Sequence, residues 1–275
     1  MISVATMGSM GRLGNQMFQY ACAYALSARH GTSLGISTHD AYRNARVNQL
    51  LETFELKSAI ALGPLEVGDG RDIEGIRYEF HESDFGYDRR IEIVPDGTEI
   101  RGYFQSERYF KHLRYQLLEE EFRFKKHITD FVDIIWQSEF SGATVCSIHI
   151  RRGDYKKISE THPNLDSSYY SLAASEIPEC DVYAVFSDEP GLAAVIMQEV
   201  TAIPADKIVY PDVDYGTSMA MMSRCDHHII ANSSFSWWGA WLSKGSGFIV
   251  APKLWFGPSG PKNWSDIYCE GWLAI

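Results

Sequence analysis

The sequence has 275 residues, of which 45% are hydrophobic and 13% aromatic, and this composition excludes an intrinsically disordered chain. A chain of that length buries a sizeable core, as one large domain or two medium ones. The formal net charge of -11 argues against general nucleic-acid binding, which requires a basic surface to replace counterions.

The amino-terminal segment predicts a strand followed by a helix. Residues 2–5 form the candidate strand, and a helical pattern runs from Asn15 to about Arg29, with Asn15 placed to cap it. Between them three glycines are spaced GxxGxxG, a weak match to the GxGxxG fingerprint of dinucleotide sites. Helix packing alone accounts for this segment.

The next part of the chain mixes strands, loops and helices. Strands are predicted at residues 33–36 and 99–102, and helices at residues 107–120 and 130–140. We expect two domains, residues 1–125 and 126–275, with the boundary between the two helices.

One polar stretch in the first half contains four residues of metal-ligating type, His81, Glu82, Asp84 and Asp88. These residues lack the regular spacing of a metal-ligand set. A solvated loop is therefore expected.

The sequence VCSIHIRRGDY, at residues 145–155, runs an apolar strand directly into a cationic loop. Arg151 and Arg152 carry guanidinium groups suited to a diphosphate, Gly153 allows a close turn, and Asp154 adds a carboxylate. Ligands bind at the carboxyl ends of strands in open α/β sheets, so the position favours an anion site.

The alternative interpretation of this loop is an Arg–Asp ion pair that only orders the backbone. Two features count against it. His149 lies within the apolar strand, two residues before the first arginine, and a second segment suited to phosphate follows downstream.

After this loop the chain alternates strands with helices. Strands are predicted at residues 181–186, 208–210, 227–231 and 248–251, and helices at residues 190–200, 218–224 and 235–243. This alternation predicts an α/β fold with a parallel sheet covered by helices.

Two loops in this half carry candidate ligand contacts. Asp188 follows a strand and precedes Pro190, so it is either a helix cap or an acceptor for a ribose or purine. Ser233 and Ser234 precede a tryptophan-rich helix that includes Phe235, and backbone N–H groups at a helix start favour an anion. The tryptophans themselves are expected in the core.

Three segments resemble the signature motifs of the α-1,2-fucosyltransferases. HIRRGDY, at residues 149–155, is similar to the HxRRGDY motif of that family. GRLGNQMFQYA, at residues 11–21, resembles the amino-terminal motif, and CDHHIIANSSFSWWGAWL, at residues 225–242, resembles the carboxy-terminal one. The three motifs occur in the expected order and span most of the chain.

The resemblance implies a GT-B-like glycosyltransferase with two Rossmann-like domains. The amino-terminal domain lies on the acceptor side, and the carboxy-terminal domain binds the nucleotide on a parallel sheet. The implied reaction transfers L-fucose from GDP-β-L-fucose to the 2-hydroxyl of a galactoside, with inversion, in cell-surface glycan synthesis. GDP-fucose and a galactose-containing glycan are then the partners, and no metal or other cofactor is expected.

The candidate residues fall into two groups. Those expected to contact the nucleotide sugar are Arg12, His149, Arg152, Asp188, Ser233, Ser234 and Phe235. Those expected to act in catalysis are Arg151 on the leaving group, Asn15, and a general base among Asp154, Glu160 and His162, with Asp154 favoured.

This half departs from the family pattern at one place. The family has an acidic residue about seven positions before the cysteine that matches Cys225, where this chain has Ser218. Asp212 or Asp214 is the candidate substitute, so the guanine contacts stay open. Asp212 and Asp214 form the Asp-x-Asp pattern that binds Mg²⁺ or Mn²⁺ in other glycosyltransferases, but their surroundings read as an ordinary loop.

Two other classes of protein fit the sequence less well than an enzyme does. A GDP-binding regulatory module does not require the amino-terminal motif, and a carbohydrate-binding protein without catalysis does not require paired arginines at a strand end. Five scattered cysteines without a CxxC pair, and no long apolar run, favour a cytoplasmic protein without an integral membrane segment. Peripheral contact with the inner face of the cell membrane is left open.

Overall fold

In this computed structural model of the protein, the described residues are 1–4, 7, 9–37, 49–62 and 76–275. Ala5 of the predicted first strand and Gly8 of the glycine motif lie outside them. The chain forms two compact units, the first of Met1–Lys125 with Ser265–Ile267 and the second of Lys126–Trp264 with Tyr268–Ile275. Ser265–Ile267, within the predicted second domain, group with the first unit.

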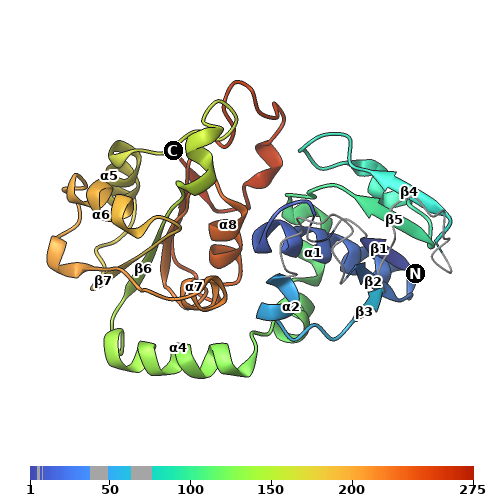
Figure 1. The fold of residues 1–275 in the computed structure, drawn as a ribbon, viewed down its shortest axis with the longest axis horizontal. Coiled ribbons are helices and arrows are strands. Elements are labelled where there is room, and N and C mark those ends of the chain that lie inside the picture. Colours follow the sequence, from blue (N-terminus) through green and yellow to red (C-terminus); the bar gives the residue numbers. More distant parts are fainter. Residues whose placement is uncertain (5–6, 8, 38–48, 63–75) are drawn as a thin grey trace. The chain divides into compact units, whose positions relative to one another are not determined.

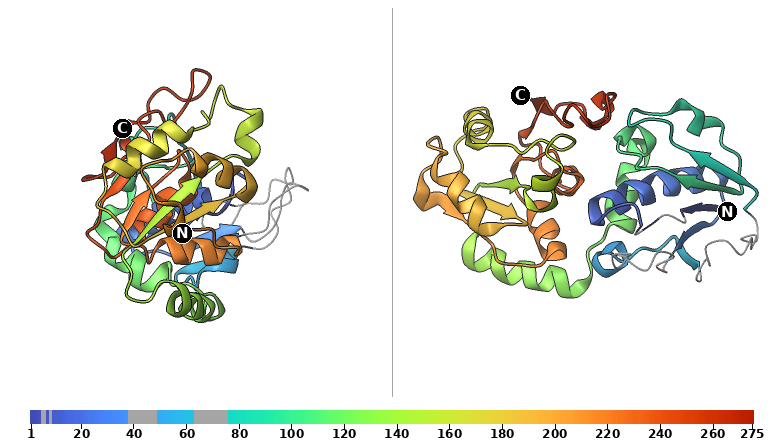
Figure 2. Two further views of the ribbon diagram at one scale, coloured as in Figure 1. Left: turned by 90° about the vertical axis from the view of Figure 1, so that its left-hand side faces the viewer. Right: turned by 45° about the horizontal axis from the view of Figure 1, so that its top comes forward.

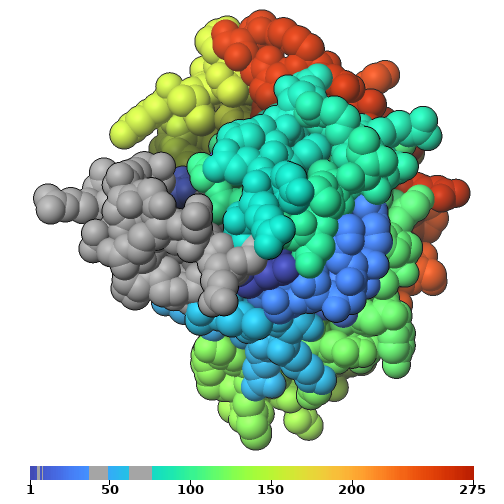
Figure 3. Space-filling view, turned by 90° about the vertical axis from the view of Figure 1, so that its right-hand side faces the viewer, coloured from blue at the N-terminus to red at the C-terminus, as the bar shows by residue number. Residues whose placement is uncertain are grey.

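The first unit contains a parallel sheet with the strand order β3-β2-β1-β5-β4. Its strands are β1 Ile2–Val4, β2 Leu34–Ser37, β3 Ala59–Leu62, β4 Tyr78–His81 and β5 Thr98–Arg101. The buried side chains of β1 and β5 place both strands in the core, whereas most of β4 is exposed. Blue-green residues of this region form a broad part of the surface in Figure 3.

Helix α1, Leu13–His30, begins two residues earlier than predicted, so the expected cap at Asn15 is wrong. A residue from another helix accepts the hydrogen bond instead. The Leu13 N–H donates to Oε1 of Gln49, on helix α2 (Gln49–Thr53), at 2.8 Å. The Leu50 N–H of α2 in turn donates to Oε1 of Gln16, on α1, at 3.0 Å. Each glutamine therefore satisfies an N–H group at the start of the other helix.

The single helix predicted at residues 107–120 is also wrong. The chain there forms four short helical pieces, η2 Glu107–Tyr109, η3 Lys111–Leu113, α3 Arg114–Gln116 and η4 Leu117–Glu121. The repeat of apolar residues predicted one helix, but local bonding switches between 3₁₀, α and π patterns along this segment.

A tight turn after β5 is held by the carboxylate of Glu82. The Tyr103 N–H donates to Glu82 at 2.8 Å, and the Phe104 N–H donates at 3.0 Å. Phe104 has a φ of 52°, a left-handed conformation that is costly for a residue with a side chain. Burial raises the pKa of Glu82 to about 7, although the two backbone N–H groups act in the opposite direction.

We predict that Glu82 makes the protein less stable as the pH rises from about 4.5 to about 7. Its folded pKa lies above its unfolded value, so the stabilising protonated form is fully present below pH 4.5 and is lost through pH 7. The loss amounts to at most about 3 kcal/mol. Chemical denaturation of Glu82→Gln across this range should show a flatter pH profile, whereas the exposed control Glu79→Gln should follow the wild type. Parallel profiles for wild type and Glu82→Gln would contradict the assignment.

The second unit contains a parallel sheet with the order β11-β10-β9-β6-β7-β8. Its strands are β6 Val145–Ile150, β7 Val182–Ser187, β8 Ile208–Val209, β9 His227–Ile229, β10 Ile249–Ala251 and β11 Leu273–Ala274. Its helices are α4 Lys126–Glu139, α5 Ser167–Ser175, α6 Pro190–Gln198, α7 Tyr215–Met222 and α8 Ser234–Trp241. Every strand and helix predicted after residue 154 is present, whereas α5 and β11 were not predicted.

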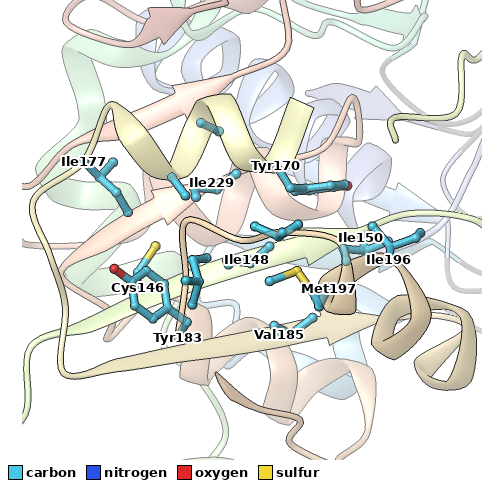
Figure 4. Packing of buried hydrophobic residues seen from close by; sticks show 14 of the residues in the cluster. Cys146, Ile148, Ile150, Tyr170, Ile177, Tyr183, Val185, Ile196, Met197 and Ile229 are labelled. Atoms are coloured by element: carbon cyan, nitrogen blue, oxygen red, sulfur yellow. The ribbon is translucent and has the colours of Figure 1, made fainter. Parts of the chain in front are cut away.

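Side chains of β6 alternate between two buried layers. Cys146, Ile148 and Ile150 pack with α5 and α6 through residues such as Tyr170 and Met197 (Figure 4). Helices α4, α7 and α8 lie on the opposite side of the sheet (Figures 1 and 2). The tryptophans of α8 are fully buried, as predicted. None of the helices within the described residues is long and apolar enough to cross a membrane.

The order of strands in this sheet reverses between β6 and β9. From β6 the chain adds β7 and β8 on one side, then returns to pair β9 with the other side of β6. The carboxyl ends of the two strands at such a reversal diverge and form the usual ligand position of an open α/β sheet. The two segments predicted to bind an anion follow β6 and β9, which confirms that they lie on neighbouring strands.

Candidate functional site

Arg151 follows β6 and lies largely buried, with 13% of its side chain exposed. Its Nη2 donates to Asp154 Oδ1 at 2.6 Å, and its Nη1 lies 2.9 Å from Asp188 Oδ2. The guanidinium carbon sits 5.2 Å from the ring centroid of Tyr155, a cation–π distance. The arginine is therefore fixed on three sides, and the ion pair with Asp154 that the alternative interpretation foresaw is present.

Asp188 links the ends of two strands and does not cap a helix. Its Oδ1 accepts a hydrogen bond from the Arg152 N–H at 2.9 Å, while its other oxygen faces Arg151. The residue that flanks the start of α6 is Glu189, whose side chain makes no capping bond. The cap alternative is therefore wrong, and the contact to a ribose or purine remains a prediction.

Arg151 and Arg152 each have an N–H donor that no described residue accepts. Nη2 of Arg152 donates to the Leu165 carbonyl. The Nε atoms of Arg151 and Arg152 are buried without a hydrogen-bond partner among the described residues. A buried donor left unpaired costs about 1–3 kcal/mol, so this arrangement favours a ligand that brings acceptor oxygens.

His149 is a neutral imidazole on the side of β6 that faces α8. Only 4% of the residue is exposed, and its ring centroid lies 5.6 Å from that of Phe235. Burial, reinforced by the charge of Arg151, lowers the pKa of His149 to about 3. Its Nδ1 is buried without a partner within the described part of the chain. His149 and Phe235, both predicted to contact the nucleotide sugar, thus lie together beside the loop that carries Arg151 and Arg152, here called the arginine loop.

Ser233 caps helix α8 with its own side chain, because its Oγ accepts a hydrogen bond from the Phe235 N–H at 3.3 Å. Ser234 is the first residue of the helix. The loop before it is tied to the arginine loop, since the Tyr155 hydroxyl donates to the Asn232 carbonyl at 3.0 Å. Burial raises the pKa of Tyr155 to about 12, which keeps this donor protonated. Sequence reasoning assigned no role to Tyr155 or Asn232, because their contact spans two motifs.

Glu160 and His162 lie on one loop that a carboxy-terminal segment holds by its backbone. The Ser259 N–H donates to the Glu160 carbonyl, and the Gly257 N–H donates to the Thr161 carbonyl, each at 2.9 Å. A Cβ atom at Gly257 would lie 2.4 Å from the Glu160 carbonyl oxygen, so only glycine allows this approach.

His162 stacks on the ring of Tyr155 at a centroid distance of 4.5 Å. Burial lowers its pKa, so the imidazole is neutral near neutral pH and able to accept a proton. Glu160 is exposed, and Asp154 is bound to Arg151. The structure thus gathers the three base candidates around one loop region without choosing among them.

Arg12 and Asn15 belong to the first unit. Arg12 is exposed and flanks the start of α1. Asn15 Oδ1 accepts a hydrogen bond from Nε2 of Gln105 at 2.9 Å. Gly11, with a φ of 104°, leaves room for the Asn15 side chain, which would collide with any Cβ atom there. Their predicted roles toward substrate stay predictions.

Asp214 of the Asp-x-Asp pattern caps helix α7. It accepts hydrogen bonds from the Gly216 N–H at 2.8 Å, the Thr217 N–H at 3.1 Å and the Thr217 hydroxyl at 2.6 Å. Within the described ranges, no group of three or more His, Cys, Asp or Glu residues is arranged to hold a metal ion. The same holds for the stretch from His81 to Asp88, where Asp88 instead caps η1 (Arg89–Ile93).

The fold is similar to that of solved fucosyltransferase structures. The fucosyltransferase NodZ from Bradyrhizobium has a TM-score of 0.53 and 13% identity, over 95% of this chain and 96% of that one. POFUT1 in complex with GDP has a TM-score of 0.55 and 12% identity, over 90% and 95% of the two chains. The predicted GT-B-like α/β fold is confirmed.

The chain belongs to glycosyl transferase family 11, whose model matches residues 2–275. Its relatives include the alpha-1,2-colitosyltransferase of Escherichia coli, 30% identical over 100% of this chain and 99% of that protein. The galactoside 2-alpha-L-fucosyltransferase SEC1 of Bos taurus is 24% identical over 90% of this chain and 67% of its own length. The predicted membership of the α-1,2-fucosyltransferase family is thus confirmed, and the protein is a glycosyltransferase.

We predict that Gly257→Ala destabilises the protein by about 1–3 kcal/mol, because the added methyl group overlaps the Glu160 carbonyl. The matched control is Gly191→Ala in α6, where a Cβ atom meets nothing within 4 Å. That change should be neutral or stabilise by up to about 1 kcal/mol. Urea unfolding measures both. Equal stability of the two variants would show that the contact at Gly257 is not tight.

Proposed function

We propose that this protein transfers L-fucose from GDP-β-L-fucose to the 2-hydroxyl of a galactoside, with inversion, in the synthesis of cell-surface glycans. The family supports glycosyl transfer, and the named fucosyltransferases among its relatives support the donor and the linkage. The two alternatives, a regulatory GDP-binding module and a carbohydrate-binding protein without catalysis, have no comparable support. We further propose that the protein acts in the cytoplasm.

Arg151 is the observation that carries the proposal. It is largely buried, it lies at the reversal of strand order, and its fork faces the loops after β6 and β7. When the bond between fucose and GDP breaks, negative charge develops on the diphosphate. A preorganised guanidinium in a site shielded from water stabilises that charge more than it stabilises the bound donor. Arg152 and the start of α8 at Ser233 and Ser234 are proposed to share the phosphates.

The other predicted residues complete the proposed site. His149, Phe235 and Asp188 are proposed to contact the nucleotide, because they border the arginine loop. One of Asp154, Glu160 and His162 is proposed to accept the proton of the acceptor hydroxyl. Asn15 is proposed to act in catalysis, and Arg12 to contact the nucleotide sugar.

A second donor sugar has a specific observation in its favour. The relative at 30% identity over the whole chain is named a colitosyltransferase, so colitose is the alternative sugar to fucose. Both versions share the α-1,2 linkage, and the assay must therefore offer both donors. Faster transfer of colitose than of fucose would change the sugar in the proposal and leave the rest in place.

The test is fucosyl transfer to an array of galactose-terminated glycans, with release of GDP as the second readout. We expect Arg151→Ala to lower kcat/KM at least about 100-fold, and Arg151→Lys to recover little, because a point charge cannot replace the bidentate fork. Arg224→Ala is the matched control, since Arg224 pairs with Asp133 on exposed helix surface. Near wild-type turnover of a folded Arg151→Ala variant would remove Arg151 from the mechanism.

We also propose that transfer requires no divalent metal, because the arginines and the start of α8 supply the positive charge that a metal would bring. Asp214 supports this proposal, since its carboxylate is engaged in capping α7. Turnover should therefore be unchanged after treatment with EDTA and after addition of Mn²⁺. Loss of activity on chelation, restored by Mn²⁺, would make Asp212 and Asp214 the first residues to test as ligands.

A further inference from the structure

The two carboxylates on Arg151 differ in their exposure to solvent. Asp188 has 22% of its side chain exposed and also accepts the Arg152 N–H. A Cβ atom at position 153 would lie only 2.3 Å from Oδ2 of Asp188, so the backbone at Gly153 passes directly over this carboxylate. Asp154 has 41% of its side chain exposed and lies on the short η5 helix, Gly153–Lys157. Asp188 is thus built into the strand ends, and Asp154 lies at the solvent side.

The charges around the arginine fork balance. Arg151 and Arg152 are offset by Asp154 and Asp188, and the next cation along the loop, Lys156, is paired with Glu189. A nucleoside diphosphate brings at least two negative charges close to this group. With both carboxylates in place, a phosphate oxygen at Nη2 of Arg151 would meet a like charge. One carboxylate must therefore give way, and the more exposed one is cheaper to return to water.

We propose that Asp154 occupies the place on Arg151 Nη2 that a phosphate oxygen of a nucleoside diphosphate takes, and leaves it when that ligand binds. Asp188 stays in place during the exchange and is the positioning residue that keeps the arginine fork aimed. This inference rests on the proposed function, since it concerns the same phosphate site. It adds a competition within the protein that sets the affinity for the diphosphate.

The inference gives the two aspartates opposite effects on affinity. Asp154→Asn removes the competing charge, so GDP should bind about two- to fivefold more tightly, the range expected for an exposed ion pair. Asp188→Asn keeps an acceptor for the Arg152 N–H but loses the charge that aims Arg151, so GDP should bind about tenfold more weakly.

The experiment is calorimetric titration of the full chain with GDP, together with guanosine as a competitor that lacks phosphates. Guanosine affinity should not change in Asp154→Asn, because that carboxylate competes with the phosphates alone. Asp188→Asn should weaken GDP binding more than guanosine binding, whereas a general structural defect would weaken both ligands equally. Asp206→Asn is the matched control. It removes one negative charge from the same unit. Asp206 precedes β8, so it lies at the amino ends of the parallel strands, whereas the arginines follow their carboxyl ends.

GDP binding is the readout for Asp154→Asn because Asp154 is also a candidate base. A change in the turnover of this variant would therefore have two explanations. Gly153→Ala gives an independent route to Asp188, since the new methyl group must push the carboxylate aside. This variant should weaken GDP binding in the same direction as Asp188→Asn, and weaken guanosine binding less.

Weaker or unchanged GDP binding by a folded Asp154→Asn variant would overturn the inference, and so would an equal gain in the Asp206→Asn control. Asp188→Asn with wild-type GDP affinity would remove its positioning role. A wild-type protein that does not bind GDP at all would instead refute the proposed function. The two failures are therefore distinguishable in one set of titrations.

Discussion

Arg151 and Asp188 follow Ile150 and Ser187, which are register partners on the parallel strands β6 and β7. This register places the two charged residues side by side at the same edge of the sheet, before any loop conformation is considered. The Asp188 carboxylate also accepts a hydrogen bond from the Arg152 N–H. Gly153 has no side chain, so the backbone there can pass close to Asp188. The loop conformation, the direction of the guanidinium and the environment of His149 all depend on this one pair.

The sequence was sufficient to predict which residues gather at this edge. The apolar run of β6, the arginines after it and the serines before α8 identify two strand ends, and alternation of strands with helices predicts a parallel sheet. His149, Arg151, Asp154 and Asp188 lie together there in the structure, and their roles stay predictions. The sequence did not indicate that Asp188 binds the arginines, because its partners are 36 or more residues away and depend on the register of β6 and β7.

Errors in the predicted fold share this origin. Asn15 has the residue type of a helix cap, but α1 starts earlier because Gln49 supplies an acceptor from another helix. The helix predicted at residues 107–120 has the right periodicity, yet its backbone breaks into short pieces. Gly257 gives no signal as a single glycine, and its importance lies in the carbonyl group of a distant loop. Local sequence patterns predict a helix or strand well when the hydrogen-bond partners of its ends lie nearby in the sequence.

The overall charge of -11 places a further demand on a site for a diphosphate. An acidic protein repels an approaching anion at long range, although salt at physiological strength screens this beyond about 8 Å. Attraction must then come from a few fixed donors at close range. Two arginines balanced by two aspartates carry little net charge, so selectivity depends on geometry: the planar fork of Arg151, the buried Nε donors and the start of α8. In the proposed diphosphate site, the positions of the ligand's oxygens therefore matter more than its total charge.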